Sequence, residues 1–386
     1  MAGAHVILDA LLVRANPTGV GRSILELTRA LAAADRGLDF TVLATAPEMF
    51  STVARVPRWR VVHCPGATGG TLRKAWYTQV FLPGLVRKLG GDLLHSLQFV
   101  APLRLGCPSV VTVHDLAWLQ FPGTVEEPRA SYYRLLVPRS LDRAAVIVTN
   151  SDSTAADVAR LYPDTSARVQ VTPFGTPSWV WQQPETADYE VTRRARPYFL
   201  FVGTLEPRKN LVGLLTAYEL FLEAAESRQH PVSAIPQLVF VGGRGWRDSR
   251  LRRRMQDLQS RNQLQVLDYC GLEELWKHYR GARALLFPSL HEGFGFPILE
   301  AMAAGLPVMT SRRGAMAEVA GQNAILVNPD RTDELVDSMC KLAWDNDLRE
   351  MLADRGPDRA RAWNWATTAE CTVAVYQQVL SAGKSA

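Results

Sequence analysis

The chain has 386 residues and a mass of 42.8 kDa, which is beyond the size at which one hydrophobic core keeps growing, so two domains are expected. Hydrophobic residues make up 47% and charged residues 21% of the chain, and this composition excludes a disordered protein. No apolar run approaches the roughly 20 residues that a membrane-spanning helix needs. The net charge of +5 favours anionic partners without choosing among nucleotides, phospholipids and nucleic acid.

The start of the chain and its cysteines predict a cytoplasmic protein. The N-terminus lacks the basic segment and the long apolar stretch of a secretory signal. The five cysteines are scattered and form no C-x-x-C pair, which predicts reduced thiols rather than disulfides or a zinc site.

Short apolar runs alternate with amphipathic helical segments along almost the whole chain, a pattern typical of βα units around parallel sheets. In the first half, strands are expected at His5–Leu8, Phe40–Ala44, Val61–His63, Leu93–His95, Val110–Val113, Val146–Thr149 and Val169–Thr172. In the second half, they are expected at Tyr198–Val202, Leu238–Val241, Gln265–Leu267, Ala284–Phe287, Val308–Thr310 and Ile325–Val327. Helices are expected between them, among others at Ile24–Ala33 and Ser151–Leu161. The fold class is therefore α/β, with two doubly wound sheets.

A proline-rich stretch from Pro173 to Pro197 interrupts the alternation and indicates a linker between domains. We expect an N-terminal domain at residues 1–180 and a C-terminal domain at residues 195–362. Ligands of doubly wound sheets bind beyond the carboxyl ends of the strands, so the loops at those ends are the candidate sites.

The loop and helix that follow the strand Ala284–Phe287 are the most informative stretch. Gly293 and Gly295 let the backbone approach a ligand closely, and the helix that begins near Pro297 offers its N-terminus to a diphosphate. The helix should be about two turns long, because Gly305-Leu306-Pro307 gives the stop signal.

Two glutamates flank the start of this helix. Glu292 lies in the loop and Glu300 lies inside the helix, so the two carboxylates can accept hydrogen bonds from two parts of one polyol ligand. The alternative is that Glu292 caps the helix and Glu300 is solvated.

Further candidates follow the strands Tyr198–Val202 and Leu238–Val241. Arg208 and Lys209 form a natural phosphate clamp ahead of a helix that begins near Asn210, although two solvated charges would give the same pattern. The loop Gly242–Trp246 can let a base or ribose lie on the backbone, and turn chemistry alone explains it equally well.

The first half offers weaker signals. Gly19 and Gly21 precede a helix, but a lone G-x-G is weak evidence of a phosphate loop. His114 directly follows the strand Val110–Val113 and therefore lies at the edge of the sheet where ligands bind, although a single histidine is more often structural.

The residues around these candidates closely resemble those of family-4 retaining glycosyltransferases, which have two Rossmann-like domains facing across a crevice (the GT-B architecture). The resemblance is strongest over Tyr269–Pro329, where Glu292 and Glu300 stand in a Gly-Phe-Gly context. It extends over Phe201–Asn210, His114-Asp115, Asn150-Ser151 and Pro173-Phe174-Gly175. In this architecture residues 363–386 would cross back to the first domain, with Trp363 and Trp365 packing at the crossing.

The resemblance implies roles for single residues. Glu292 would contact the donor sugar, Glu300 the nucleotide ribose, and Lys209 the diphosphate. The arginine usual after Gly203 is replaced by Thr204, and Arg208 is the candidate for the lost charge. The implied catalytic residues are His114, Glu292, Arg208 and Lys209. The implied donor-binding residues are Gly19, Gly21, Thr204, Gly242, Cys270, Gly293, Phe294, Gly295, Phe296 and Glu300.

The implied activity is transfer of a hexose, with retention, from a nucleotide sugar to a glycan or lipid-linked glycan. The sequence is most similar to mannosyl- or rhamnosyltransferases of surface-polysaccharide assembly, so GDP-mannose is the first donor expected. UDP-glucose, UDP-N-acetylhexosamine and dTDP-rhamnose stay open, and no metal or other cofactor is expected. Retention would follow from same-face attack assisted by the leaving phosphate.

Basic segments raise other partners. Arg73, Lys74, Arg87 and Lys88 alternate with aromatic residues and could lie on an anionic membrane, although Pro83-Gly84 weakens one continuous helix. The run Arg250–Arg254 would suit nucleic acid, but no nucleic-acid-binding motif accompanies it. A sugar-nucleotide epimerase or a phosphorylase of similar architecture is the remaining enzyme alternative.

Overall fold

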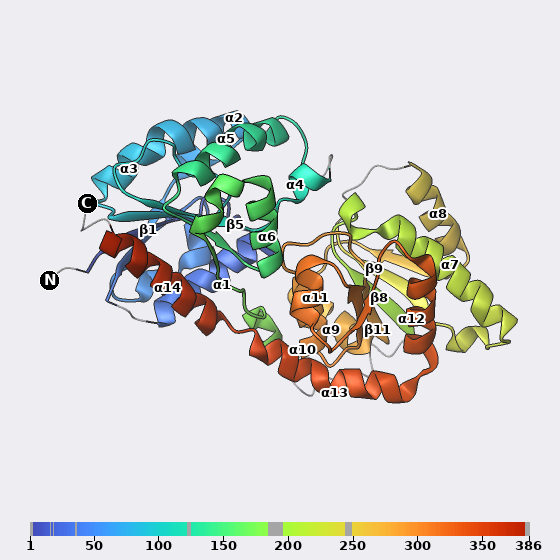
Figure 1. Cartoon of the computed structure of the whole chain (residues 1–386). Coiled ribbons are helices and arrows are strands. Elements are labelled where there is room, and N and C mark those ends of the chain that lie inside the picture. Colours follow the sequence, from blue (N-terminus) through green and yellow to red (C-terminus); the bar gives the residue numbers. More distant parts are fainter. Residues whose placement is uncertain are drawn as a thin grey trace. The chain divides into compact units, whose positions relative to one another are not determined.

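The computed structural model describes residues 3–15, 17, 19–34, 37–121, 125–183, 196–243 and 249–382. The chain divides into two compact units: one consists of Met1–Gly175 with Trp363–Ala386, and the other is Thr176–Ala362. Figure 1 shows both units as a sheet with helices on each face. Each unit is therefore a three-layer α/β structure.

The first unit contains a seven-stranded parallel sheet in the order β3-β2-β1-β4-β5-β6-β7. Its strands are β1 (His5–Asp9), β2 (Asp39–Ala44), β3 (Trp59–His63), β4 (Leu93–Ser96), β5 (Ser109–Val113), β6 (Val146–Thr149) and β7 (Val169–Val171). Its helices are α1 (Gly19–Ala33), α2 (Thr71–Trp76), η4 (Tyr77–Phe81), α3 (Leu82–Lys88), α4 (Ala117–Gln120), α5 (Arg129–Arg143), α6 (Asp152–Leu161) and α14 (Trp365–Ala382). Short 3-10 turns lie at η1 (Pro47–Phe50), η2 (Val53–Arg55), η3 (Pro65–Ala67) and η5 (Pro163–Arg168). Helices α1 and α14 cover one face of the sheet, and α2, α3 and α5 cover the other (Figure 1).

The second unit contains a six-stranded parallel sheet in the order β10-β9-β8-β11-β12-β13. Its strands are β8 (Tyr198–Val202), β9 (Gln237–Val241), β10 (Leu264–Leu267), β11 (Ala284–Phe287), β12 (Val308–Ser311) and β13 (Ile325–Val327). Its helices are α7 (Leu211–Ser227), α8 (Ser249–Ser260), α9 (Leu272–Gly281), α10 (Phe296–Ala303), α11 (Gly314–Ala320), α12 (Thr332–Trp344) and α13 (Asn346–Ala362), with 3-10 turns η6 (Ser178–Gln182), η8 (Pro207–Lys209) and η9 (Val232–Ala234). Helix α12 packs on α7 and α13 packs on α10.

These sheets confirm the predicted α/β class. All thirteen expected strands form, each within two residues of its expected ends, because strands covered on both faces have continuous apolar sequences. Helix α6 begins as expected, with the Ser151 hydroxyl accepting a hydrogen bond from the Thr154 amide at 3.1 Å. In each sheet the strand order reverses once, between β1 and β4 and between β8 and β11. At such a reversal the loops diverge and leave room for a ligand.

The end of the chain belongs to the first unit. Helix α14 packs against α1, and the buried Trp365 ring lies 5.2 Å from the ring of Phe174. Deeper in this unit, Tyr376 and His95 share a buried hydrogen bond of 2.6 Å. The first segment of this unit ends at Gly175, near the start of the proline-rich stretch rather than at residue 180, and residues 184–195 of that stretch lie outside the described residues. In the described part of the chain, every helix is too short or too polar to span a bilayer.

Candidate active site

Two loops of the second unit meet at its strand-order reversal. The loop after β8 runs from Gly203 to Asn210, and the loop after β11 runs from Pro288 to Gly295. Because β8 and β11 are neighbours in the sheet, their carboxyl ends bring these loops together. The Leu290 amide donates a hydrogen bond of 2.7 Å to the Arg208 carbonyl and fixes one loop on the other. The two strongest sequence motifs therefore form one site.

Three charged side chains form the centre of this site. The Lys209 ammonium donates to Glu292 Oε1 at 2.5 Å, and the Arg208 guanidinium binds Glu292 Oε2. Arg208 also pairs with Glu206 at 2.6 Å. Lys209 and Glu292 are buried, with exposed fractions of 6% and 7%. The alternatives of a solvated Arg-Lys pair and of a helix-capping Glu292 are therefore wrong, since the residue at the cap is Gly295.

The electrostatics keep Glu292 ionised. Burial acts to raise the pKa of Glu292, but the charges of Arg208 and Lys209 outweigh it and lower the pKa to about 2. Burial, aided by the charge of Arg208, lowers the pKa of Lys209. The Lys209 ammonium also lies 4.7 Å from the centre of the Phe287 ring. The site thus holds two cations against two carboxylates, Glu292 and Glu206, in a largely buried setting.

Glycines allow the strand ends to approach one another. The backbone of Gly242 has φ of +147°, and a Cβ there would lie 2.2 Å from the Gly203 carbonyl oxygen. Gly242 therefore has a packing role against Gly203, and Gly203 in turn borders the cluster, since a Cβ there would lie 3.5 Å from Lys209 Cε. Thr204, one residue after Gly203, is exposed. The remainder of the Gly242 loop, residues 244–248, lies outside the described residues.

Helix α10 positions the second glutamate. It begins after Gly295, whose φ of +104° favours glycine, and Pro297 occupies its first turn as expected. Glu300 is buried and accepts a hydrogen bond of 2.7 Å from the Tyr279 hydroxyl of α9. The alternative of a solvated Glu300 is therefore wrong.

The other donor-binding candidates surround α10. Gly293 is buried, and the buried Phe294 packs edge-to-face on Phe296 with ring centroids 5.2 Å apart. Cys270 is half-buried just before α9 and is not part of a disulfide. Gly293, Phe294, Phe296 and Cys270 all belong to the second unit, in which the resemblance places the donor.

The first unit holds the remaining candidates. His114 follows β5 and is buried, and its Nε2 lies 3.0 Å from the Leu97 carbonyl oxygen. A carbonyl can only accept, so Nε2 carries the proton and Nδ1 is the acceptor, while burial lowers the ring's pKa. Gly19 and Gly21 begin α1, where a Cβ at Gly21 would lie 2.9 Å from Pro17 Cβ, whereas Gly19 faces open space. Asn16 and Thr18 of this loop lie outside the described residues.

Some residues of the site were missed by sequence reasoning. Glu206 holds Arg208, Tyr279 holds Glu300, and Phe287 lies against Lys209. The Ser289 hydroxyl is buried and has no hydrogen-bond partner among the described residues. All four lie inside the stretches that carry the family resemblance, but nothing in the sequence assigned a role to any of them.

The two basic segments differ in the structure. Lys74 turns into a pocket of the first unit, whereas Arg73, Arg87 and Lys88 are exposed. In the run Arg250–Arg254, Arg254 pairs with Glu219 of α7 at 2.7 Å. That ion pair removes one charge from the face proposed for nucleic acid.

Comparison with known proteins agrees with this arrangement. The chain matches the model described as "Glycosyltransferase Family 4" over residues 17–177 and the one described as "Glycosyl transferases group 1" over residues 183–359. It is 30% identical over 291 residues to O-antigen chain mannosyltransferase B of Escherichia coli, covering 74% of each chain. It is 26% identical over 377 residues to a D-inositol 3-phosphate glycosyltransferase of Corynebacterium jeikeium, covering 90% of this chain and 88% of that one. The solved sucrose-phosphate synthase of Thermosynechococcus elongatus superposes with a TM-score of 0.76 at 21% identity, covering 98% of this chain and 100% of that one.

Two parallel-sheet α/β units, each with its loops at a strand-order reversal, define the GT-B class of glycosyltransferases. Within that class the chain belongs to glycosyltransferase family 4. The protein is therefore a glycosyltransferase.

Proposed function

We propose that the protein transfers a hexose, with retention, from a nucleotide-sugar donor to a glycan or lipid-linked glycan acceptor, without a metal. The observation that carries this proposal is the buried cluster of Lys209, Arg208 and Glu292 at the end of β8 and β11. Although Glu292 and Glu206 balance the two cations in charge, an ammonium and a guanidinium side by side are the groups that bind the oxygens of a diphosphate most strongly.

The reaction needs positive charge beside the diphosphate leaving group. As the glycosidic bond breaks, negative charge develops on the diphosphate and the sugar becomes oxocarbenium-like. Lys209 and Arg208 would stabilise the diphosphate with their positive charges, as an ammonium and a guanidinium donate strong N–H hydrogen bonds to phosphate oxygens. Retention would follow from same-face attack of the acceptor assisted by the leaving phosphate.

The two glutamates would recognise the donor at different depths. Glu292 stays ionised at neutral pH and so accepts hydrogen bonds from sugar hydroxyls. Glu300, oriented by Tyr279, would accept from the ribose. His114 would contribute its Nδ1 as an acceptor for a sugar hydroxyl, because its N–H is used by Leu97.

The donor is proposed to be GDP-mannose, with UDP-glucose, UDP-N-acetylhexosamine and dTDP-rhamnose as alternatives. The similarity to a mannosyltransferase at 30% identity supports this choice. A thermal-shift panel of nucleotide sugars tests it, since a matched donor stabilises the protein by mass action.

Two substitutions test the site itself. Lys209→Ala should weaken binding of the nucleoside diphosphate, measured by calorimetry, and Glu292→Ala should abolish most transfer while that binding is retained. Lys277→Ala, an exposed lysine of α9, is the matched control. Unchanged nucleotide affinity in Lys209→Ala would show that the phosphate assignment is wrong.

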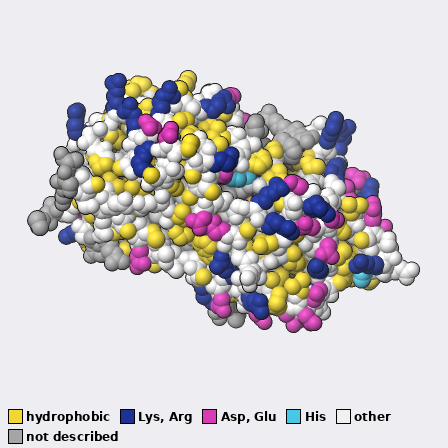
Figure 2. Space-filling view, in the orientation of Figure 1, with side chains coloured by type: hydrophobic (Ala, Val, Ile, Leu, Met, Phe, Trp, Pro, Cys, Tyr) yellow, Lys and Arg dark blue, Asp and Glu magenta, His cyan; other side chains and the backbone are white. Residues whose placement is uncertain are grey.

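We further propose peripheral contact with an anionic membrane through α2, η4 and α3. Leu72, Trp76 and Val80 recur every four residues and are 78%, 57% and 59% exposed, beside Phe81 at 53%. Contrary to expectation, Pro83 does not interrupt the helical run, because it falls in the first turn of α3. Figure 2 shows Lys and Arg side chains among hydrophobic ones over this region, at the upper left of the view. Such a basic, apolar surface suits anionic lipid.

Co-sedimentation with vesicles of phosphatidylglycerol or phosphatidylcholine tests this contact. Trp76→Ser with Phe81→Ser should lose binding to the anionic vesicles. The control pair, Leu220→Ser with Val232→Ser, removes exposed apolar residues from the second unit and should bind as the unmodified protein does. Equal recovery of both double variants would contradict the membrane proposal.

A further inference from the structure

A second pocket lies in the first unit, at its own strand-order reversal. The loops after β1 and β4 form two of its walls, and α2 and α5 form the others, enclosing a cavity of about 270 Å³. This volume approaches that of ligand pockets, which hold roughly 300–1,000 Å³. The position is the one at which doubly wound sheets bind their ligands.

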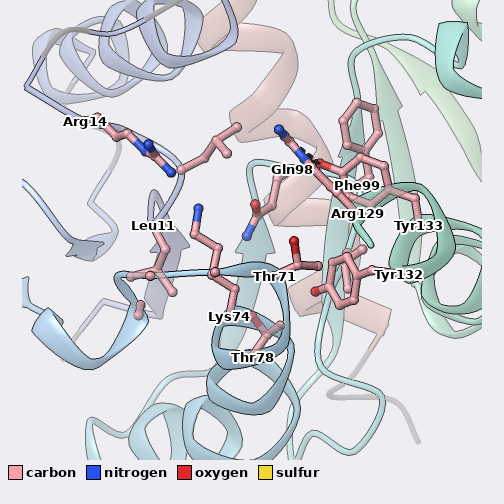
Figure 3. A pocket seen from close by; sticks show the side chains of 15 residues that line it. Leu11, Arg14, Thr71, Lys74, Thr78, Gln98, Phe99, Arg129, Tyr132 and Tyr133 are labelled. Carbon is pink, nitrogen blue, oxygen red and sulfur yellow. Dashed lines mark hydrogen bonds between the residues drawn. The ribbon is translucent and has the colours of Figure 1, made fainter. Parts of the chain in front are cut away.

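Three cations converge on this pocket from three separate elements. Arg14 follows β1, Lys74 comes from α2 and Arg129 from α5. Figure 3 shows the Lys74 side chain pointing into the pocket, with Arg14 on one side and Gln98 and Arg129 on the other. Among the residues that the structure describes, none of the three cations forms an ion pair with a carboxylate. Burial, followed by the charges of Arg14 and Arg129, lowers the pKa of Lys74 and outweighs the opposing charge of Asp9, as expected where cations are held close together.

The acidic group beneath the pocket forms no ion pair with these cations in the described part of the chain. Asp9, at the end of β1, is fully buried, and burial raises its pKa. Its carboxylate accepts hydrogen bonds from the Leu11 amide at 3.1 Å, the Ser96 hydroxyl at 3.3 Å and the Gln98 amide at 3.1 Å. Asp9 therefore orders the loops after β1 and β4 and holds Gln98, rather than pairing with Lys74.

The opposite wall is aromatic and keeps one cation in place. Arg129 donates to the Tyr133 hydroxyl from Nε at 3.0 Å and from Nη2 at 2.8 Å, and its guanidinium lies 5.3 Å from the centre of that ring. Tyr132 and Phe99 line the same side. The pocket thus offers positive charge beside flat apolar surface, which fits a ligand with an anionic group next to a ring or a chain.

We propose that this pocket binds the phosphoryl group of the acceptor, so that the protein glycosylates an acceptor bearing a phosphate or diphosphate ester. This inference rests on the proposed function, because it names the acceptor of the same reaction. A phosphoryl group suits the pocket because its oxygens accept hydrogen bonds from several cations at once. The phosphoryl group would come from a soluble sugar or polyol phosphate, or from a lipid diphosphate.

Binding of inorganic phosphate and pyrophosphate, measured by thermal shift and by phosphorus NMR titration, tests the site. The titrations use the Lys209→Ala protein, so that phosphate in the donor site does not contribute. Adding Lys74→Gln should raise the dissociation constant for pyrophosphate at least tenfold, whereas Lys74→Arg should keep it within a few-fold. Arg104→Gln, which removes an exposed cation elsewhere in the first unit, should leave it unchanged. Lys74→Gln should also melt no lower than its parent without phosphate, since it relieves repulsion among the three cations.

Either of two results overturns the proposal: no binding of pyrophosphate to the parent protein, or equal binding to the Lys74→Gln protein. Nucleoside diphosphate affinity, measured with Lys209 intact, distinguishes failure of this inference from failure of the donor site, because Lys74→Gln should not alter it. Glucose 6-phosphate and geranyl diphosphate separate the two sources. Binding of either one that depends on Lys74 supports the proposal and identifies the source, and binding of neither contradicts it.

Discussion

Replacing Glu292 by glutamine tests how strongly the buried cluster stabilises the second unit. The pKa of Glu292 lies at about 2 in the folded protein, against an ordinary value of 4.5. At about 1.4 kcal/mol for each pH unit, the ionised carboxylate contributes about 3 kcal/mol to folding at neutral pH. Because the folded pKa is the lower one, this contribution is complete above about pH 4.5 and is lost as the pH falls towards about 2. Glu292→Gln should therefore cost about 3 kcal/mol at pH 7.5, within the range for breaking a buried pair.

The assay is urea denaturation combined with hydrogen exchange of peptides from β11 and α10, which reads the second unit alone. Glu274→Gln, an exposed glutamate of α9, is the control and should change stability by less than about 0.5 kcal/mol. The difference between the unmodified and the Glu292→Gln protein should be constant from pH 8 to about pH 5 and should shrink below it. A Glu292→Gln protein as stable as the control, or a difference independent of pH down to pH 3, would refute the reasoning.

Three further predictions concern the same unit. Gly242→Ala should destabilise the protein by about 1–3 kcal/mol or more, because φ is +147° there and the new Cβ would lie 2.2 Å from the Gly203 oxygen. Gly243→Ala is the control, since its Cβ would meet open space and should not change stability. Thermal melting compares the two variants. Tyr279→Phe should cost about 1.5–3 kcal/mol in urea denaturation, since the buried Glu300 carboxylate loses a donor at 2.7 Å. Hexosyl transfer should persist in excess EDTA, because Lys209 and Arg208 supply the positive charge; full loss with recovery on adding Mg²⁺ would contradict a metal-independent reaction.

The sheets could be predicted because each strand is covered on both faces and therefore reads as an apolar run. The continuous helical run from α2 through η4 to α3 could not be predicted so well. Pro83 breaks a helix when it lies in the interior, but here it occupies the first turn of α3, where no N–H partner is lost. The preceding segment, Tyr77–Phe81, is a π-helical turn that joins α2 to α3.

The site could be predicted only as separate loops. The motifs located Lys209 and Glu292 at strand ends, but the two residues are 83 positions apart in the sequence and their contact depends on β8 being the neighbour of β11. The sequence does not state this adjacency; the strand order does. The pairing of Tyr279 with Glu300 depends in turn on how α9 and α10 are rotated against each other. Sequence reasoning therefore identified the residue types of the site and left their partners open.

The two strand-order reversals differ in how their cations are balanced, and this difference has a functional consequence. In the second unit Lys209 and Arg208 share the buried Glu292 and Arg208 also pairs with Glu206, so a diphosphate bound there would lie beside carboxylates that remain in place. In the first unit Arg14, Lys74 and Arg129 form no ion pair with a carboxylate among the described residues. The nearby carboxyl group of Asp9 is held by Leu11, Ser96 and Gln98, so an anion in the pocket would meet less competition. A carboxylate kept beside the phosphates weakens their binding but can hold a sugar hydroxyl, which is what a donor site requires. A site whose cations form no such ion pair would instead recognise the anion itself, which is what positioning a phosphorylated acceptor would require.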